Sequence, residues 1–165
     1  MRGILKTFIC LAVLLTVSNA ADVIRYKVPG STFPIASAVE IPSDVTIVNL
    51  SGVVPSVVNP NATKGSAEAY GNTEQQTISS LTGIKNTLNS IGLDMGDVIK
   101  MQVFLVGDPK LSGKMDFDGF MKGYTKFFGT KEQPNLPTRS VFQVTALANP
   151  VWLVEIEVTA IRKSR

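Results

Sequence analysis

Two charged side chains in the last third of this 165-residue chain have types that could do chemistry. Arg139 stands at the mouth of an expected strand over 140–146, and Glu155 lies inside the next expected strand, over 151–161. A guanidinium is a planar fork that matches a carboxylate, and a positioned carboxylate can accept a proton from water. The two residues therefore predict a pocket that binds a small carboxylate and activates water beside it.

The composition removes several kinds of chemistry. The chain has no histidine, which is the commonest general base and the commonest metal ligand. Its one cysteine, Cys10, lies in the apolar run 7–17, which Arg2 and Lys6 precede and the small residues of 18–20 follow. This is the pattern of a secretory signal peptide, because a membrane span needs about 20 apolar residues. We expect residues 1–20 to be cleaved, and the mature protein to be periplasmic or secreted without stable membrane association.

Loss of the signal peptide also changes the charge. The whole chain has 16 basic and 13 acidic residues, and removal of Arg2 and Lys6 would leave a formal net charge of +1. The remaining lysines are scattered, so we expect no nucleic-acid partner. Residues 21–165 suit one domain with a single core.

Apolar periodicity predicts the elements that must position Arg139 and Glu155. Strands are expected over 23–28, 45–50 and 97–106, with loops over 29–44 and 53–71. One helix carries apolar residues from Ile78 to Ile91 and ends at Gly92, and a second carries aromatic residues from Phe117 to Phe128. With the two C-terminal strands the order is ββαβαββ, an α+β sandwich with its helices on one face of the sheet.

Two local details can be predicted inside these helices. Thr73 and Gln76 have the spacing of a capping box at the start of the first helix. Gly119 and Gly123 lie inside the second helix, where each costs about 1 kcal/mol of helix propensity relative to alanine. A close approach of that helix to the sheet would explain both glycines.

Five short motifs follow one another along the mature chain. They are Ser51-Gly52 with Pro55 and Asn59-Pro60, the Asp97–Leu105 strand, Tyr124-x-x-Phe127-Phe128, Pro137-Thr138-Arg139-Ser140, and Val154-Glu155-Ile156-Glu157. In this order they resemble the YjgF/RidA family of small trimeric proteins. The resemblance covers nearly all of residues 21–165. It implies a chorismate-mutase-like fold of one mixed sheet with two helices on one face, assembled as a homotrimer with clefts between subunits.

The resemblance also implies an activity. In active members of the family the clefts hydrolyse enamine and imine intermediates, such as 2-aminoacrylate and 2-iminopropanoate, to 2-keto acids and ammonia. On that pattern Arg139 would hold the substrate carboxylate, and Glu155 would orient or deprotonate the attacking water. The residues expected to line the pocket or hold the ligand are Gly52, Gln102, Ser140 and Val141. Hydrolysis of an imine by this route needs no metal or cofactor, and we expect none.

Some departures from the family pattern keep a second hypothesis open. Active members usually carry a tyrosine in the first loop, where this chain reads Thr32-Phe-Pro-Ile-Ala-Ser-Ala38, and a polar residue where it has Val53. The alternative is a non-catalytic trimer that binds a small carboxylate or acts as a chaperone. Arg139 could also cap a strand and pair with a surface acid. Glu155 and Glu157 share a strand face, so either could face the pocket.

Overall fold

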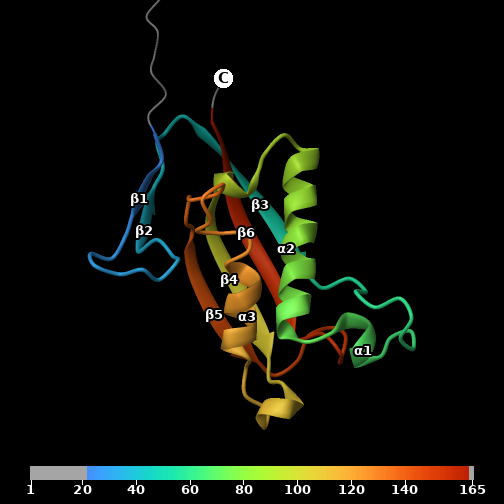
Figure 1. Cartoon of the computed structure of the whole chain (residues 1–165). Coiled ribbons are helices and arrows are strands. Elements are labelled where there is room, and N and C mark those ends of the chain that lie inside the picture. The colour runs from blue at the N-terminus through green and yellow to red at the C-terminus, as the bar shows by residue number, and fades with distance from the viewer. Residues whose placement is uncertain (1–21, 164–165) are drawn as a thin grey trace, which may run out of the picture.

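A computed structural model describes residues 22–163, which form a mixed four-stranded sheet with helices on one of its faces (Figure 1). The covering helices are α2 (Thr73–Ser90) and α3 (Phe117–Tyr124). A separate two-stranded sheet, β1 (Ile24–Tyr26) with β2 (Ala38–Glu40), lies to one side of the main sheet and its helices (Figure 1). The expected signal peptide, over residues 1–20, lies outside the described residues. The expected α+β fold with a mixed sheet is confirmed.

The order of the strands in the main sheet is β3-β6-β4-β5. These strands are β3 (Val45–Val53), β6 (Val154–Lys163), β4 (Val98–Val106) and β5 (Thr138–Val144). β4 and β5 are parallel, and the segment that contains α3 forms the crossover between them, while β6 pairs antiparallel with both β3 and β4. The last two strands of the chain are therefore not neighbours, because β4 lies between them.

Alternation along the strands divides the sheet into two faces. Val154, Ile156 and Val158 of β6 are buried against the helices together with Met101 and Val103 of β4. Leu81 and Ile84 of α2 and Phe120 and Tyr124 of α3 complete this core. The residues that alternate with them point to the opposite face, which no helix among residues 22–163 covers (Figure 1). We call it the open face.

Two expectations about α2 have different outcomes. The capping box exists, but Asn72 and Gln75 form it: each side chain accepts a hydrogen bond at 3.0 Å from the backbone N–H of the other. The prediction of Thr73 and Gln76 was wrong because both side chains are buried, and the Gln76 amide bonds the segment before β6 instead. Gly92, with a φ of 73°, follows the end of the helix as expected.

The glycines of α3 have a different reason from the expected one. A Cβ on Gly123 would lie 2.7 Å from the Cβ of Thr77 in α2 and 3.0 Å from the Glu74 carbonyl oxygen. A Cβ on Gly119 would collide with the carboxylate of Asp116, which caps α3. The expected close approach to the sheet was therefore wrong, and α3 instead packs closely on α2.

Other boundaries also differ from the expected ones. The first expected loop contains β2, and the second contains a short helix, α1 (Ala67–Tyr70), so the described residues hold three α-helices rather than two. β3 continues to Val53 through an irregularity after Leu50, and α3 ends before Phe128. Two 3₁₀ turns flank β4: η1 (Met95–Asp97) and η2 (Pro109–Leu111).

Candidate functional site

Arg139 lies at the start of β5 within a group of aromatic rings. It pairs in register with Met101 of β4, which places its side chain on the face that the helices cover. The guanidinium carbon Cζ lies 4.2 Å from the ring centre of Tyr124, 5.0 Å from that of Phe120 and 5.5 Å from that of Phe33. Such distances allow cation–π attraction. We call these three rings the aromatic cage.

The cage changes the electrostatics of both polar groups in it. Burial lowers the pKa of the Arg139 guanidinium from its ordinary value, although Tyr124 acts in the opposite direction. Burial also raises the pKa of Tyr124 to about 12, against the influence of Arg139. The Tyr124 hydroxyl donates a hydrogen bond of 2.8 Å to the Pro34 carbonyl oxygen, so the first loop is tied to the cage.

One donor of this guanidinium has no partner among the residues that the structure describes. The Nη1 atom of Arg139 is buried and makes no hydrogen bond with any of residues 22–163. The ion pairs within residues 22–163 are Lys126–Glu74 and Lys163–Asp22, and neither includes Arg139. A buried donor without a partner costs about 1–3 kcal/mol, more when it is charged. A ligand carboxylate is the kind of acceptor that would remove this cost.

Glu155 lies next to Gly52 on the open face. It pairs in register with Phe104, two positions from Glu157, so both acids point to the same face as expected. The carboxylate of Glu155 lies against the backbone of Gly52, because a Cβ added there would collide with Oε1. The structure therefore brings together Gly52 and Glu155 among the expected site residues.

Gln102 is placed beside the other acid. It is the register partner of Glu157, and both line a hollow of about 270 Å³ on the open face. Asn49 and Thr159 line the same hollow, where the Thr159 hydroxyl donates a 2.9 Å hydrogen bond to the Asn49 side chain. The neighbours of Glu157 are therefore polar side chains, whereas Glu155 lies beside the backbone of Gly52 and is the register partner of Phe104.

The remaining expected residues divide between the two faces of β5. Ser140 is exposed on the open face in register with Gln102, and Val141 lies on the helix side in register with Val103. Ser140 is thus a neighbour of the Gln102 hollow, while Val141 is on the Arg139 side. The expected set does not form one cluster within a single subunit.

Arg139 and Glu155 in particular do not meet within a subunit. They point to opposite faces, and β4 lies between their strands. Their register partners on β4, Met101 and Phe104, are three positions apart, or about 10 Å along the strand at a rise of about 3.3 Å per residue. One small substrate cannot contact both side chains of the same copy.

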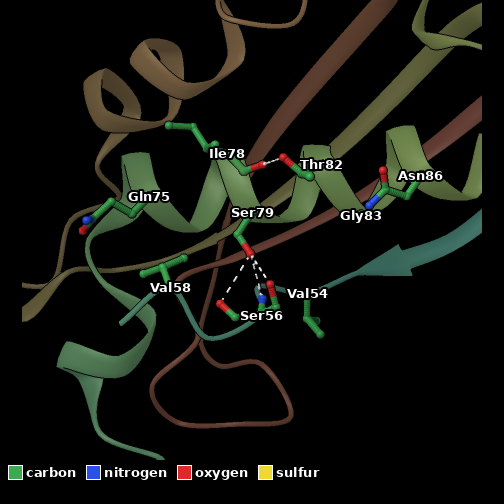
Figure 2. Close-up of a pocket in the computed structure, with 9 residues that line it drawn as sticks. All are labelled: Val54, Ser56, Val58, Gln75, Ile78, Ser79, Thr82, Gly83 and Asn86. Atoms are coloured by element: carbon green, nitrogen blue, oxygen red, sulfur yellow. Dashed lines mark hydrogen bonds between the residues drawn. The ribbon is translucent and has the colours of Figure 1, made fainter. Parts of the chain in front are cut away.

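A separate groove of about 420 Å³ lies between α2 and the segment that follows β3 (Figure 2). Ser56 and Ser79 join its two sides: the Ser56 backbone N–H donates to the Ser79 hydroxyl at 2.8 Å, and the two hydroxyls are 2.9 Å apart. None of the expected site residues lines this groove. It does not belong to the site that the sequence predicts.

Comparison with known proteins decides the family. The family model Ribonuc_L-PSP, described as Endoribonuclease L-PSP, matches residues 34–162. The chain belongs to the YjgF/RidA family. The Escherichia coli K12 protein named "Putative reactive intermediate deaminase TdcF" is 33% identical over 138 residues, which are 84% of this chain and 94% of that protein. A "RutC family protein" of Haemophilus influenzae is 31% identical over 137 residues, 83% of this chain and 93% of the relative.

Solved structures of the YjgF/RidA family have the same fold. E. coli TdcF with bound serine has a TM-score of 0.56 and 31% identity, and the match covers 82% of this chain and 93% of that one. The YjgF gene product of E. coli has a TM-score of 0.55 and 28% identity over the same shares of the two chains. Among residues 22–163, no helix is long and apolar enough to cross a membrane, and no three His, Cys, Asp or Glu side chains are grouped to hold a metal ion.

The aromatic cage is the part of the site that the sequence did not predict. Phe120 and Tyr124 were expected in the core from their helical spacing, but that spacing does not reveal a guanidinium against their rings. Phe33 lies in a loop 106 positions before Arg139. The sequence marked this loop by the absence of the usual tyrosine over Thr32–Ala38, which does not reveal a contact with Arg139.

Proposed function

We propose that this protein hydrolyses reactive enamine and imine intermediates to 2-keto acids and ammonia. The observation that carries the proposal is the Arg139 guanidinium, held by the aromatic cage with a buried Nη1 donor that lacks a partner among residues 22–163. Two comparisons support it: a relative named "Putative reactive intermediate deaminase TdcF", and a structure of TdcF with bound serine, which carries a carboxylate.

The proposed chemistry uses the two charged side chains in different ways. Arg139 binds the carboxylate of a 2-imino acid, and Glu155 accepts a proton from water as the water oxygen attacks the protonated imine carbon. The carbinolamine that forms then loses ammonia, with the proton returned to the departing nitrogen, and leaves the 2-keto acid. A general base of this kind contributes about 10²–10⁴-fold in rate.

We further propose that Arg139 and Glu155 act from different copies of the chain in a homotrimer. Their positions on opposite faces of the sheet rule out a shared substrate within one subunit. The open face supports this assembly, because Phe104 and Phe142 stack there with ring centres 6.2 Å apart and Phe142 is 47% exposed. Apolar side chains left in contact with water favour association with another surface.

A second candidate function is binding without turnover. The first loop contributes the Phe33 ring to the Arg139 site rather than a hydroxyl group, and this favours retention of a carboxylate over proton transfer. We do not propose RNA cleavage, although the family description names an endoribonuclease. RNA-binding surfaces depend on clustered basic residues, whereas the lysines of this chain are scattered.

The test of the proposed activity compares four variants with wild type on freshly generated 2-iminopropanoate. Arg139→Ala removes the carboxylate fork, so kcat/KM falls heavily, and Arg139→Lys recovers little of it because the fork geometry is lost. Glu155→Gln cannot accept a proton, so kcat falls by about 10²-fold or more while binding of 2-ketobutyrate is retained. Glu157→Gln changes the other acid on the same face of the same strand, so a loss of kcat in Glu155→Gln alone identifies Glu155 as the base.

The outcomes separate the two candidate functions. Ammonia release at the wild-type rate by both the Arg139 and the Glu155 variants contradicts the mechanism. A wild-type protein that releases no ammonia, yet binds 2-ketobutyrate only when Arg139 is present, supports binding without turnover instead. Each variant is compared only if it has the oligomeric state of the wild type.

The export of the protein also stays a proposal, based on residues 1–20. Cleavage after Ala20 gives an exported chain whose intact mass corresponds to a start at Ala21, or one residue later. A full-length product confined to the cytosol contradicts it.

A further inference from the structure

We propose that the Arg139 site accepts 2-imino acids with bulky apolar side chains, and that Phe33 is the residue that determines this specificity. The inference rests on the proposed function for its reaction, but its ligand preference can be measured by binding alone. It names the substrate class, which the family membership leaves open.

The position of Phe33 relative to the guanidinium is the first reason. Its ring lies over Cζ of Arg139 at 5.5 Å, while 44% of the residue is exposed. A carboxylate binds a guanidinium in the plane of the fork. The substrate atoms that follow the carboxylate therefore run along the ring that flanks this plane, and the exposed part of Phe33 is the surface that they contact.

The hydrogen bonding of the first loop is the second reason. The backbone N–H groups of Phe33, Ile35 and Ala36 already donate to Ser31, Phe33 and Pro137, at 3.1, 2.8 and 3.0 Å. Pro34 has no N–H group, and its carbonyl oxygen accepts from Tyr124. These groups cannot replace the water that a polar substrate side chain would lose. An apolar side chain has no such loss and gains contact with Phe33.

The loop is also held firmly against the core. Arg25 of β1 donates to the carbonyl oxygens of Val98 and Leu136, at 2.9 and 2.7 Å, and to that of Gly96 at 2.9 Å. Leu136 lies three residues before Arg139 in the chain. Arg25 therefore fixes the β1–β2 hairpin to the segment that leads into β5, and a fixed ring discriminates between ligands better than a mobile one.

The experiment measures kcat/KM for two substrates that differ in the side chain, 2-iminopropanoate and 4-methyl-2-iminopentanoate. We expect wild type to prefer the larger substrate by about tenfold or more in kcat/KM. Ratios of this size are those that one to a few methylene groups produce in an apolar pocket. Phe33→Ala reduces the preference to about twofold or less, and Phe33→Leu retains most of it. Leu111→Ala is the matched control, because Leu111 is equally exposed at 44% and lies in η2.

Binding of the corresponding keto acids, 4-methyl-2-oxopentanoate and pyruvate, is measured by calorimetry on the same proteins. An active enzyme without a preference, or with one that Phe33→Ala does not change, overturns the inference and leaves the proposed function intact. Inactive protein that binds the larger keto acid about tenfold more tightly, in a Phe33-dependent way, supports the inference while the proposed reaction fails. A protein that neither hydrolyses the imines nor binds the keto acids overturns both the inference and the proposed function.

Discussion

The Arg139 guanidinium is positioned by side chains from two distant parts of the chain. Phe120 and Tyr124 come from α3, and Phe33 comes from the loop between β1 and β2. This surrounds a cation with ring faces rather than with an acid, and it leaves the buried Nη1 donor without a partner among residues 22–163. The motif around Arg139 predicts a carboxylate site, but the ring contacts depend on tertiary packing that no local pattern records.

Gly52→Ala tests the contact between Gly52 and the Glu155 carboxylate. The new Cβ would collide with Oε1 of Glu155, which is the flexible end of a side chain, so the carboxylate moves and the backbone does not. We expect imine hydrolysis to fall by about 10–100-fold, because a displacement on the order of 1 Å can cost about 10²-fold. Thermal unfolding should be nearly unchanged. Thr46→Ala in the same strand is the control, and an unaffected rate in Gly52→Ala would separate Glu155 from the catalytic step.

Tyr124 gives a prediction for the pH dependence of stability. Its pKa is raised to about 12 in the folded protein, from a value near 10 in the unfolded chain. The folded state therefore holds the phenol proton more tightly, and this stability is complete below pH 10 and is lost as the pH rises from about 10 to about 12. The loss is on the order of 2–3 kcal/mol for a shift of this size.

The measurement is the free energy of unfolding in urea at pH 8, 10 and 11 for wild type and Tyr124→Phe. The variant lacks the bond to Pro34 and should be less stable by about 0.5–1.5 kcal/mol at pH 8. Its stability should decline less than that of wild type above pH 10. Parallel curves for the two proteins would mean that Tyr124 does not titrate as its burial requires.

At the scale of elements, the open question in the sequence was which strands pair. Strands were expected over 97–106, 140–146 and 151–161, and the structure has them over 98–106, 138–144 and 154–163. A turn between the last two is compatible with a hairpin or with the observed separation by β4. Two-residue periodicity correctly assigned Glu155 and Glu157 to one face. It could not place Arg139 on the other face, because that depends on the parallel register with Met101.

The same limit explains the glycines of α3. A glycine inside a helical pattern indicates a close neighbour but does not identify it. The neighbour of Gly123 is Thr77, because the crossover that contains α3 brings it against α2 rather than directly onto the strands. Helix periodicity predicted that both helices cover the sheet, while their mutual contact had no separate signal.

Gly123→Ala tests this helix contact. Its Cβ would approach Thr77 to 2.7 Å, which forces the helices apart, and such overpacking costs about 1–3 kcal/mol. The gain in helix propensity of about 1 kcal/mol offsets part of this cost. We expect the thermal midpoint to fall by a few degrees, about 2–4 °C per kcal/mol for a domain of this size. Lys122→Ala, an exposed change in the same helix, is the control, and a raised midpoint in Gly123→Ala would argue against close packing of α2 and α3.

At the scale of the whole molecule, the open face of the sheet determines how the two halves of the site could combine. Helices cover one face, so the core is complete on the Arg139 side, while the Glu155 side is left without a covering layer among residues 22–163 (Figure 1). Polar residues such as Gln102 and Glu157 share this face with Phe104 and Phe142. A mixed surface of this kind is typical of an interface between subunits, which has an apolar centre and a polar rim.

The last prediction is that a charge on the open face separates the subunits and removes activity together. Light scattering after size exclusion should give about three times the chain mass for wild type at micromolar concentration, as the proposed homotrimer with closed cyclic symmetry would have. Phe142→Glu places an unpaired carboxylate where subunits would bury an exposed ring, and we expect monomers without imine hydrolysis. Ile91→Glu, at a 39% exposed apolar position after α2, should remain trimeric and active. Monomeric Phe142→Glu with the wild-type rate would show that a single subunit carries the complete site, and the division of Arg139 and Glu155 between copies would then be wrong.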